Sequence, residues 1–171
     1  MRLKEPLKTA EISTPLGPMV AVGDESFLYL VDFASLKIER AIQRLQKRAN
    51  STMLKGSTLS ITSIKEELDQ YFQGKLQTFK TPLFDFGTPF QKRVWEELRN
   101  IPFKETRSYA EIAEAIGRPT AYRAVAMANS TNQFAIVIPC HRVINANGLL
   151  GGYGGGIARK KWLLDHEKRA L

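Results

Sequence analysis

The alternation of apolar and polar residues predicts a small β-sheet at the start of the chain. Two short runs, Glu11–Thr14 and the apolar Met19–Val22, flank the segment Pro15–Pro18, whose prolines and glycine favour a tight turn. These runs therefore predict a β-hairpin, and the run Phe27–Phe33 predicts a further strand after it.

Helical periodicity follows these strands. Ser35 can cap a first helix, and residues 50–60 are predicted to form a loop. A capping box of Ser63 and Glu66 predicts a second helix, which ends at Gly74. The apolar stripes are Ile38, Ala41, Ile42 and Leu45 in the first helix, and Ile64, Leu68, Tyr71 and Phe72 in the second. Residues 76–87 are predicted to be an extended connector.

Capping signals also predict short helices in the second half of the chain. Thr88 and Gln91 form a capping box with Pro89 at the first helical position. The buried stripe of this helix is predicted to be Phe90, Val94 and Leu98, with Trp95 beside it. A final helix is predicted over Ile157–Lys168, with Trp162 and Leu163 as its apolar positions.

A pair of short helices lies between these two. Ser108 and Glu111 form a second capping box, Gly117 ends that helix, and Pro119 begins the next. The apolar side of the first helix of the pair is Ile112, Ala113 and Ile116. Two short helices joined by a tight turn are typical of a helix-turn-helix, which beside a basic domain indicates DNA binding.

The second helix of this pair has distinct faces. At about 100° per residue, Arg123 falls opposite the apolar side, with Ala126 near it. The apolar side is predicted to be Ala121, Ala124, Val125 and Ala128. One long cation beside a small residue suits close approach to a nucleic acid, and the alternative is an ordinary solvated arginine.

The only cysteine of the chain follows an apolar run. The run Phe134–Ile138 predicts a short buried strand, and Pro139 would end it because proline has no amide hydrogen. Cys140 then lies at the strand's exit beside His141, and adjacent residues of an extended strand point to opposite faces. Because the thiolate is the attacking form of cysteine, Cys140 is a candidate nucleophile. The alternative is a buried structural cysteine.

Charge and composition narrow the classes of partner. The 171 residues carry a formal net charge of +8, and residues 88–171 contribute most of it, with 13 basic and 7 acidic residues. This balance suits a polyanionic partner. A lone cysteine excludes an internal disulfide, and no apolar run approaches the roughly 20 residues of a membrane span. We therefore expect a cytoplasmic protein with no membrane partner. Residues 1–87 contain neither cysteine nor histidine, which excludes a structural zinc site there.

Several features of the second half occur together: the sequence Pro139–Val143, the upstream residues Asn132, Arg123 and Tyr109, and the glycine-rich run Gly151–Gly156. In this combination the chain resembles the O(6)-alkylguanine-DNA alkyltransferases, most strongly between Thr88 and Glu167. The resemblance implies an α+β fold of two small domains. Residues 1–87 would be a ribonuclease H-like β-sheet domain with helices and the connector. Residues 88–171 would be a mainly helical, winged-helix-like domain with the helix-turn-helix and the active-site cysteine.

The resemblance also implies an activity. Such a protein repairs DNA by direct, irreversible and stoichiometric transfer of an alkyl group from O(6)-alkylguanine to its own Cys140, after the base is flipped out of the duplex. It needs no cofactor and no metal. The implied partner is double-stranded DNA bearing O(6)-alkylguanine, contacted in the minor groove by a cytoplasmic, nucleoid-associated monomer. Activity on O(4)-alkylthymine and cooperative binding on DNA are left open.

Roles for single residues follow from the same resemblance. The implied catalytic residues are Cys140, His141, Glu167, Asn132 and Tyr109. The implied DNA-binding residues are Arg123, Tyr109, Ser108, Thr120, Ala121, Ala126 and Arg142. The implied pocket for the flipped base consists of Tyr153, Gly154, Val143 and Pro139. In this scheme a water bridges Cys140 and His141, Glu167 holds the imidazole, and Arg123 fills the space that the base leaves.

Two positions depart from the family pattern, and three other classes of protein compete with it. Gln133 follows Asn132 where proline is usual, and Ala126 stands where glycine is usual, so the fit to DNA can differ. An alkyltransferase-like lesion-binding protein is the main alternative, but it lacks the cysteine. A papain-type hydrolase has its cysteine and histidine far apart in sequence, and a helix-turn-helix regulator leaves Cys140 unexplained.

Overall fold

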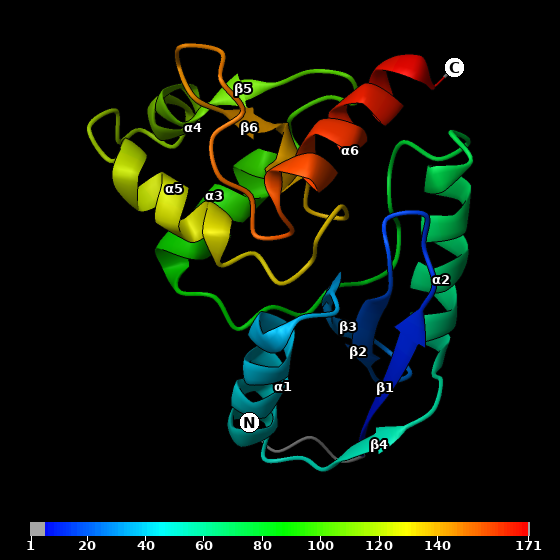
Figure 1. Ribbon diagram of the computed structural model, residues 1–171. Coiled ribbons are helices and arrows are strands. Elements are labelled where there is room, and N and C mark those ends of the chain that lie inside the picture. The colour runs from blue at the N-terminus through cyan, green and yellow to red at the C-terminus, as the bar shows by residue number, and fades with distance from the viewer. Residues whose placement is uncertain (1–5, 171) are drawn as a thin grey trace. The chain divides into compact units, whose positions relative to one another are not determined.

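The computed structural model describes residues 6–170 as two compact units, which divide between Phe84 and Asp85. The predicted boundary, between residues 87 and 88, falls in the same extended segment. The ends of the predicted domains, residues 1–5 and 171, lie outside the described residues. Within the described residues, no helix is long and apolar enough to cross a membrane. The prediction of a two-domain α+β fold is confirmed, with a sheet in the first unit and mainly helices in the second (Figure 1).

The first unit is built on a four-stranded sheet with the strand order β3-β2-β1-β4. Its strands are β1 (Leu7–Ile12), β2 (Met19–Gly23), β3 (Leu28–Phe33) and β4 (Met53–Lys55). The predicted hairpin is confirmed, since β1 and β2 are antiparallel and Thr14 closes their turn by donating to the Gly17 carbonyl at 2.6 Å. β3 pairs antiparallel with β2, and β4 runs parallel to β1.

The prediction of a loop over residues 50–60 is wrong, because β4 forms within it. The Leu7 amide donates to the Thr52 carbonyl at 3.0 Å, which fixes the register in which Met53 pairs with Leu7. Leu7 and Met53 are far apart in sequence and pair only in the folded sheet. The segment Met53–Lys55 is too short for its sequence pattern to predict a strand.

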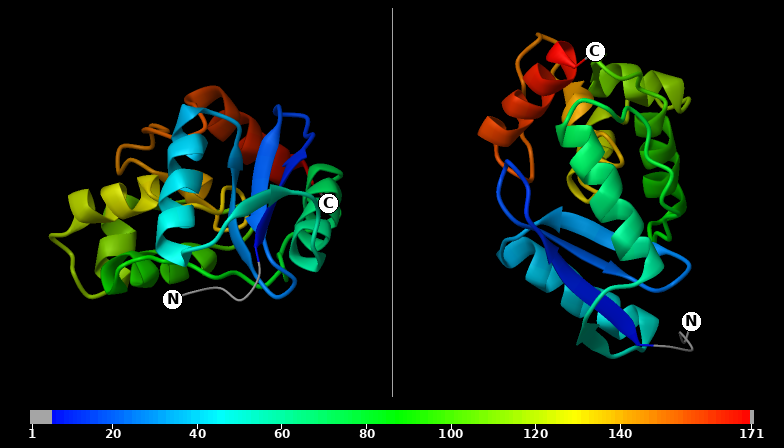
Figure 2. Two further views of the ribbon diagram at one scale, coloured as in Figure 1. Left: turned by 90° about the horizontal axis from the view of Figure 1, so that it is seen from below. Right: turned by 90° about the vertical axis from the view of Figure 1, so that its right-hand side faces the viewer.

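Two helices cover opposite faces of this sheet, α1 (Leu36–Ala49) and α2 (Leu59–Phe72) (Figures 1 and 2). Ser35 caps α1 as predicted, because its hydroxyl accepts from the Ile38 amide. The capping box predicted at Ser63 is wrong. Thr58 caps α2 one turn earlier, and the Ser63 hydroxyl instead hydrogen-bonds to that of Thr81 at 2.7 Å.

The second unit packs four helices around a short turn and a two-stranded parallel sheet. Its elements are α3 (Pro89–Arg99), β5 (Arg107–Ser108), α4 (Tyr109–Ala115), α5 (Tyr122–Ser130), the 3₁₀ turn η1 (Cys140–Arg142), β6 (Val143–Ile144) and α6 (Ile157–Arg169). Both predicted capping boxes are confirmed, at Thr88 with Gln91 and at Ser108 with Glu111.

The start and the buried face of α5 differ from the prediction. Pro119 does not begin this helix; the chain first makes a turn in which the Ala121 amide donates to the Arg118 carbonyl at 2.9 Å, and α5 begins at Tyr122. Its buried residues are Val125, Ala128 and Asn129, whereas Ala124 is exposed. Trp95 of α3 fixes this orientation, because its indole donates to the Ala128 carbonyl at 2.9 Å.

Candidate active site

The segment before the cysteine is a buried turn, so the prediction of a strand at Phe134–Ile138 is wrong. Asn132 holds the turn from inside: its amide donates to the carbonyls of Phe134 (3.3 Å) and Ile138 (2.9 Å), and its oxygen accepts from the Phe134 amide (2.9 Å). Ile136 lies in the left-handed region with φ of 71°. The run is apolar because the whole turn is buried, and its composition is the same as that of a buried strand.

Pro139 turns the chain so that Cys140 begins a tight helical turn. Pro139 has φ of −79° and ψ of 61°, and the Cys140 amide donates to the Ile138 carbonyl at 2.7 Å, which is the geometry of an inverse γ-turn. Cys140, His141 and Arg142 then form η1. The expectation that Cys140 and His141 alternate along an extended strand is therefore wrong. Cys140 is a reduced thiol with 7% of its surface exposed.

Parallel pairing of β5 with β6 brings a second segment to the cysteine. Ser108 pairs with Ile144, so that Tyr109 at the start of α4 lies near Cys140. Burial, and the negative charge of a Cys140 thiolate, raise the pKa of Tyr109, while a hydrogen bond with Asn129 lowers it. The Asn129 amide also donates to the Cys140 carbonyl at 3.5 Å. Sequence reasoning missed Asn129, which is 7% exposed on the inner face of α5.

His141 and Glu167 form a hydrogen-bonded pair in the interior. His141 Nε2 lies 2.6 Å from Glu167 Oε1, and these side chains are 0% and 1% exposed. Burial lowers the pKa of His141; the bond and charge of Glu167 oppose this effect, and the cations of Arg142 and Lys160 add to it. Burial alone would raise the pKa of Glu167, but the hydrogen bonds and charges of His141 and Arg142 outweigh burial and hold this pKa at about 2.

Arg142 faces the interior, which corrects its predicted role in DNA binding. It is 6% exposed, and its Nε and Nη2 atoms donate to the two oxygens of Glu167 at 2.9 and 3.1 Å. Nη1 donates to the Ile101 carbonyl at 2.8 Å, and the guanidinium lies 5.5 Å from the ring centre of Phe103. All three nitrogens of this fork are bonded in the interior, so Arg142 is a structural partner of Glu167.

Lys160 is a buried cation that sequence reasoning also missed. It is 0% exposed, and its ammonium donates to the carbonyls of Val143 (2.5 Å), Gly152 (3.2 Å) and Leu150. Burial lowers its pKa to about 8, against the raising effect of the Cys140 charge. The signal was available in the helical spacing, because Lys160 and Glu167 share the buried face of α6 with Leu163 and Leu164.

The residues predicted to form the base pocket differ in exposure. Pro139 and Val143 are buried next to η1, Tyr153 is half-buried, and Gly154 is exposed in the loop before α6. Lys160 connects the start of this loop, through the Leu150 and Gly152 carbonyls, to the Val143 carbonyl at the start of β6.

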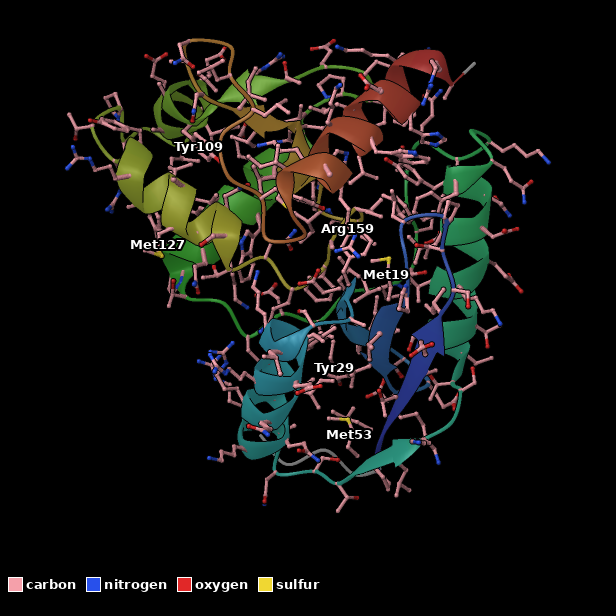
Figure 3. All side chains as sticks on the ribbon, in the orientation of Figure 1. Met19, Tyr29, Met53, Tyr109, Met127 and Arg159 are labelled. Atoms are coloured by element: carbon pink, nitrogen blue, oxygen red, sulfur yellow. The ribbon has the colours of Figure 1, made fainter. Side chains whose placement is uncertain are left out.

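Apart from Arg142, the predicted DNA-binding residues lie in β5, α4 and α5 and in the turn before α5. Arg123 and Thr120 are exposed, and Ala121 and Ala126 are half-buried. Ser108 is 9% exposed, because its hydroxyl caps α4. Sequence reasoning missed Met127, which is 67% exposed on α5, one helical turn after Arg123 (Figure 3). Arg123 and Met127 therefore lie on the same outer face.

Both halves of the chain match models of one protein family. Residues 89–169 match the DNA-binding domain of 6-O-methylguanine DNA methyltransferase, and residues 7–84 match its ribonuclease-like domain. The methylated-DNA–protein-cysteine methyltransferase of Shigella flexneri is 42% identical over 160 residues, covering 92% of this chain and 93% of that protein. The protein of the same name from Mycobacterium leprae is 44% identical over 160 residues, covering 94% and 92%.

Solved structures agree with these matches. The crystal structure of Mycobacterium tuberculosis OGT in complex with DNA gives a TM-score of 0.84 at 39% identity, covering 96% of this chain and 94% of that chain. The crystal structure of Mycobacterium tuberculosis O6-methylguanine methyltransferase gives a TM-score of 0.82 at 42% identity, with the same coverage.

Proposed function

Because this chain belongs to the 6-O-methylguanine DNA methyltransferase family, a family of DNA-repair enzymes that accept the methyl group on a cysteine, we propose that Cys140 is the acceptor and O(6)-alkylguanine in duplex DNA the substrate. Cys140 is the only cysteine of the chain. The observation that carries the proposal is the position of this cysteine, directly before a buried His141–Glu167 pair.

The buried pair supplies a base for the thiol. A neutral imidazole can take the Cys140 proton through a bridging water, and its bond to Glu167 stabilises the imidazolium that results. Glu167 stays ionised because Arg142 donates to both of its oxygens. Lys160 lies close enough for its charge to interact with that of Cys140, and the same attraction favours the thiolate.

The transfer itself is a displacement at carbon. The thiolate attacks the alkyl carbon, a carbon–sulfur bond forms, and the bond from that carbon to O6 of guanine breaks. The electron pair stays on the guanine, whose ring takes up a proton that replaces the one His141 removed from Cys140. In this proposal the Tyr109 hydroxyl donates a hydrogen bond to the guanine ring as negative charge develops there. The thioether is inert towards water and the chain has no second thiol, so each protein reacts once.

DNA recognition belongs to the outer face of α5 in this proposal. The base must leave the duplex to reach Cys140, which costs a few kcal/mol of unstacking. Arg123 is exposed and long enough to occupy the space that the base leaves, and Met127 extends the same face with an apolar side chain. We further propose that the protein acts as a monomer in the cytoplasm.

The direct test is substitution of the sulfur. We expect Cys140→Ser to abolish transfer from a duplex carrying O(6)-methylguanine and to keep the affinity for that duplex, because α5 is unchanged. Intact mass should rise by one methyl group in the wild type only, and peptide mapping should place the label on Cys140. Label on another residue would overturn the assignment.

A further inference from the structure

The outer face of α1 carries a stripe of positive charge. This helix contains five basic residues and one acidic residue, Glu39. At 100° per residue the basic side chains all fall within an arc of about 100°, and Glu39 lies outside it. The members of this α1 cationic stripe are Lys37, Arg40, Arg44, Lys47 and Arg48, and all are exposed. The buried face of α1, which includes Ile38 and Leu45, packs on the sheet (Figure 1).

The stripe is not a general property of the first half of the chain. Residues 1–87 contain 12 basic and 10 acidic residues. Of these, α1 contains five basic residues and one acidic residue. The remainder has seven basic and nine acidic residues and is therefore slightly negative. The positive charge of this half is thus concentrated on a single helix face.

The arrangement works against the stability of the helix. Arg44 lies four residues from both Arg40 and Arg48 and three from Lys47, and like charges at these spacings repel. Within residues 6–170, the side chains of Arg40, Arg44 and Lys47 form no ion pair. A face that served solubility alone would intersperse acidic residues. The spacing therefore fits a partner that supplies regularly spaced negative charges.

We propose that the α1 cationic stripe binds the phosphates of duplex DNA, as a contact surface separate from α5. This inference rests on the proposed function, since it takes DNA as the partner. From Lys37 to Arg48 the stripe is about 16 Å long, and a duplex presents one negative charge per roughly 1.7 Å of its axis. Several phosphates can therefore meet it. Such contacts raise affinity without reading sequence.

The test compares two triple variants of equal charge. The stripe variant combines Arg40→Gln, Arg44→Gln and Lys47→Gln. The control combines Lys55→Gln, Lys65→Gln and Lys75→Gln, which are exposed in the same unit but off the stripe. Affinity for an undamaged duplex oligonucleotide is measured at a series of sodium chloride concentrations. Affinity decreases with salt, so the slope of log affinity against log salt is negative. We expect this slope to become shallower by about one for each phosphate that the variant no longer neutralises, up to about three, in the stripe variant only.

Equal slopes in the two variants would overturn the proposal, because net charge alone would then explain binding. If the stripe binds an acidic protein or an anionic lipid instead of DNA, the stripe variant should have the same slope as the wild type. That result would also overturn the proposal. If the triple variant does not fold, Arg44→Gln alone decides, with an expected change of about one. Methyl transfer from free O(6)-methylguanine should keep its wild-type rate in both variants. A wild type that transfers nothing would defeat the proposed function and leave the comparison of slopes valid.

Discussion

Glu167 is the residue at which the buried charges of the site converge. Its Oε1 atom is hydrogen-bonded to both His141 and Arg142, and its Oε2 atom accepts a hydrogen bond from Arg142. A carboxylate without these partners could not be held ionised in the interior, because desolvation disfavours its charge. The guanidinium of Arg142, together with the hydrogen bond to His141, therefore keeps Glu167 in the ionised form on which His141 depends as a base.

This arrangement predicts how the second unit responds to acid. The pKa of Glu167 is about 2, below its ordinary 4.5, so its contribution to stability is complete above pH 4.5 and is lost as the pH falls towards 2. The difference corresponds to roughly 3 kcal/mol of unfolding free energy. Glu167→Gln should lose about 3–5 kcal/mol at neutral pH, because Arg142 is left buried and unpaired, and should show a flatter dependence in acid.

Urea unfolding at several pH values measures this effect. Both tryptophans, Trp95 and Trp162, lie in the second unit, so their fluorescence reports on that unit alone. Glu114→Gln is the matched control, since Glu114 is exposed on α4 and should leave the wild-type pH dependence intact. A Glu167→Gln protein with the acid sensitivity of the wild type would show that another carboxyl group is responsible.

Substitutions of Arg123 can distinguish base flipping from the methyl-transfer step. Because its side chain is exposed on α5, Arg123→Ala should leave the fold intact and slow transfer from duplex DNA far more than transfer from free O(6)-methylguanine. Arg123→Lys should fall between, since lysine lacks the planar guanidinium. Arg99→Ala, an exposed arginine of α3, controls for the loss of charge. Equal losses on duplex and free base would mean that Arg123 supports the pocket itself.

At the scale of elements, the turn held by Asn132 determines where the cysteine lies. The turn contains a β-branched residue, Ile136, with positive φ, which costs of order 1–3 kcal/mol. Burial of its apolar side chains and the three bonds to Asn132 offset that cost. The turn is therefore stable only as a whole, together with its asparagine.

Removal of the asparagine side chain should release this turn. Asn132→Ala leaves two carbonyls and one amide of buried residues without this partner, and we expect a loss of roughly 2–4 kcal/mol of unfolding free energy. Transfer should slow as well, because Cys140 follows directly. Asn100→Ala, which removes only an exposed contact with Glu97, should cost under about 1 kcal/mol by the same urea measurement. Equal costs would argue against Asn132 as the brace.

Elements that are marked by local signals in the sequence are easier to predict than elements that depend on contacts between distant residues. The capping boxes at Thr88 and Ser108 are complete within four residues, so they can be recognised without a structure. The box at Ser63 is equally local but does not form, because α2 begins earlier, at Leu59 after Thr58. β4 depends on a partner strand more than 40 residues away in sequence. The turn at Phe134–Ile138 has the composition of a strand, and only the bonds from Asn132 distinguish the two. Cys140, His141 and Glu167 were predicted, but Arg142 and Lys160 acquire their roles from tertiary contacts.

At the scale of the whole molecule, one acceptor serves the entire chain. Cys140 is the only thiol, and in the described part of the chain it forms no disulfide. We expect about one methyl group per protein molecule with excess methylated duplex, and no second transfer after prolonged incubation. Counting labelled methyl groups against protein by intact mass checks this number. Transfer that continues beyond one group per chain would require a route that regenerates the thiol.

The fork of Arg142 has a consequence for how related sequences can diverge. Substitution of Arg142 or Glu167 alone leaves a buried charge without its partner. Substitution of both by apolar residues can leave the stability unchanged. His141 depends on the same carboxylate. In a lineage that no longer needs the chemistry, these three positions are therefore expected to drift together, and in one that keeps it, to be inherited as a single unit.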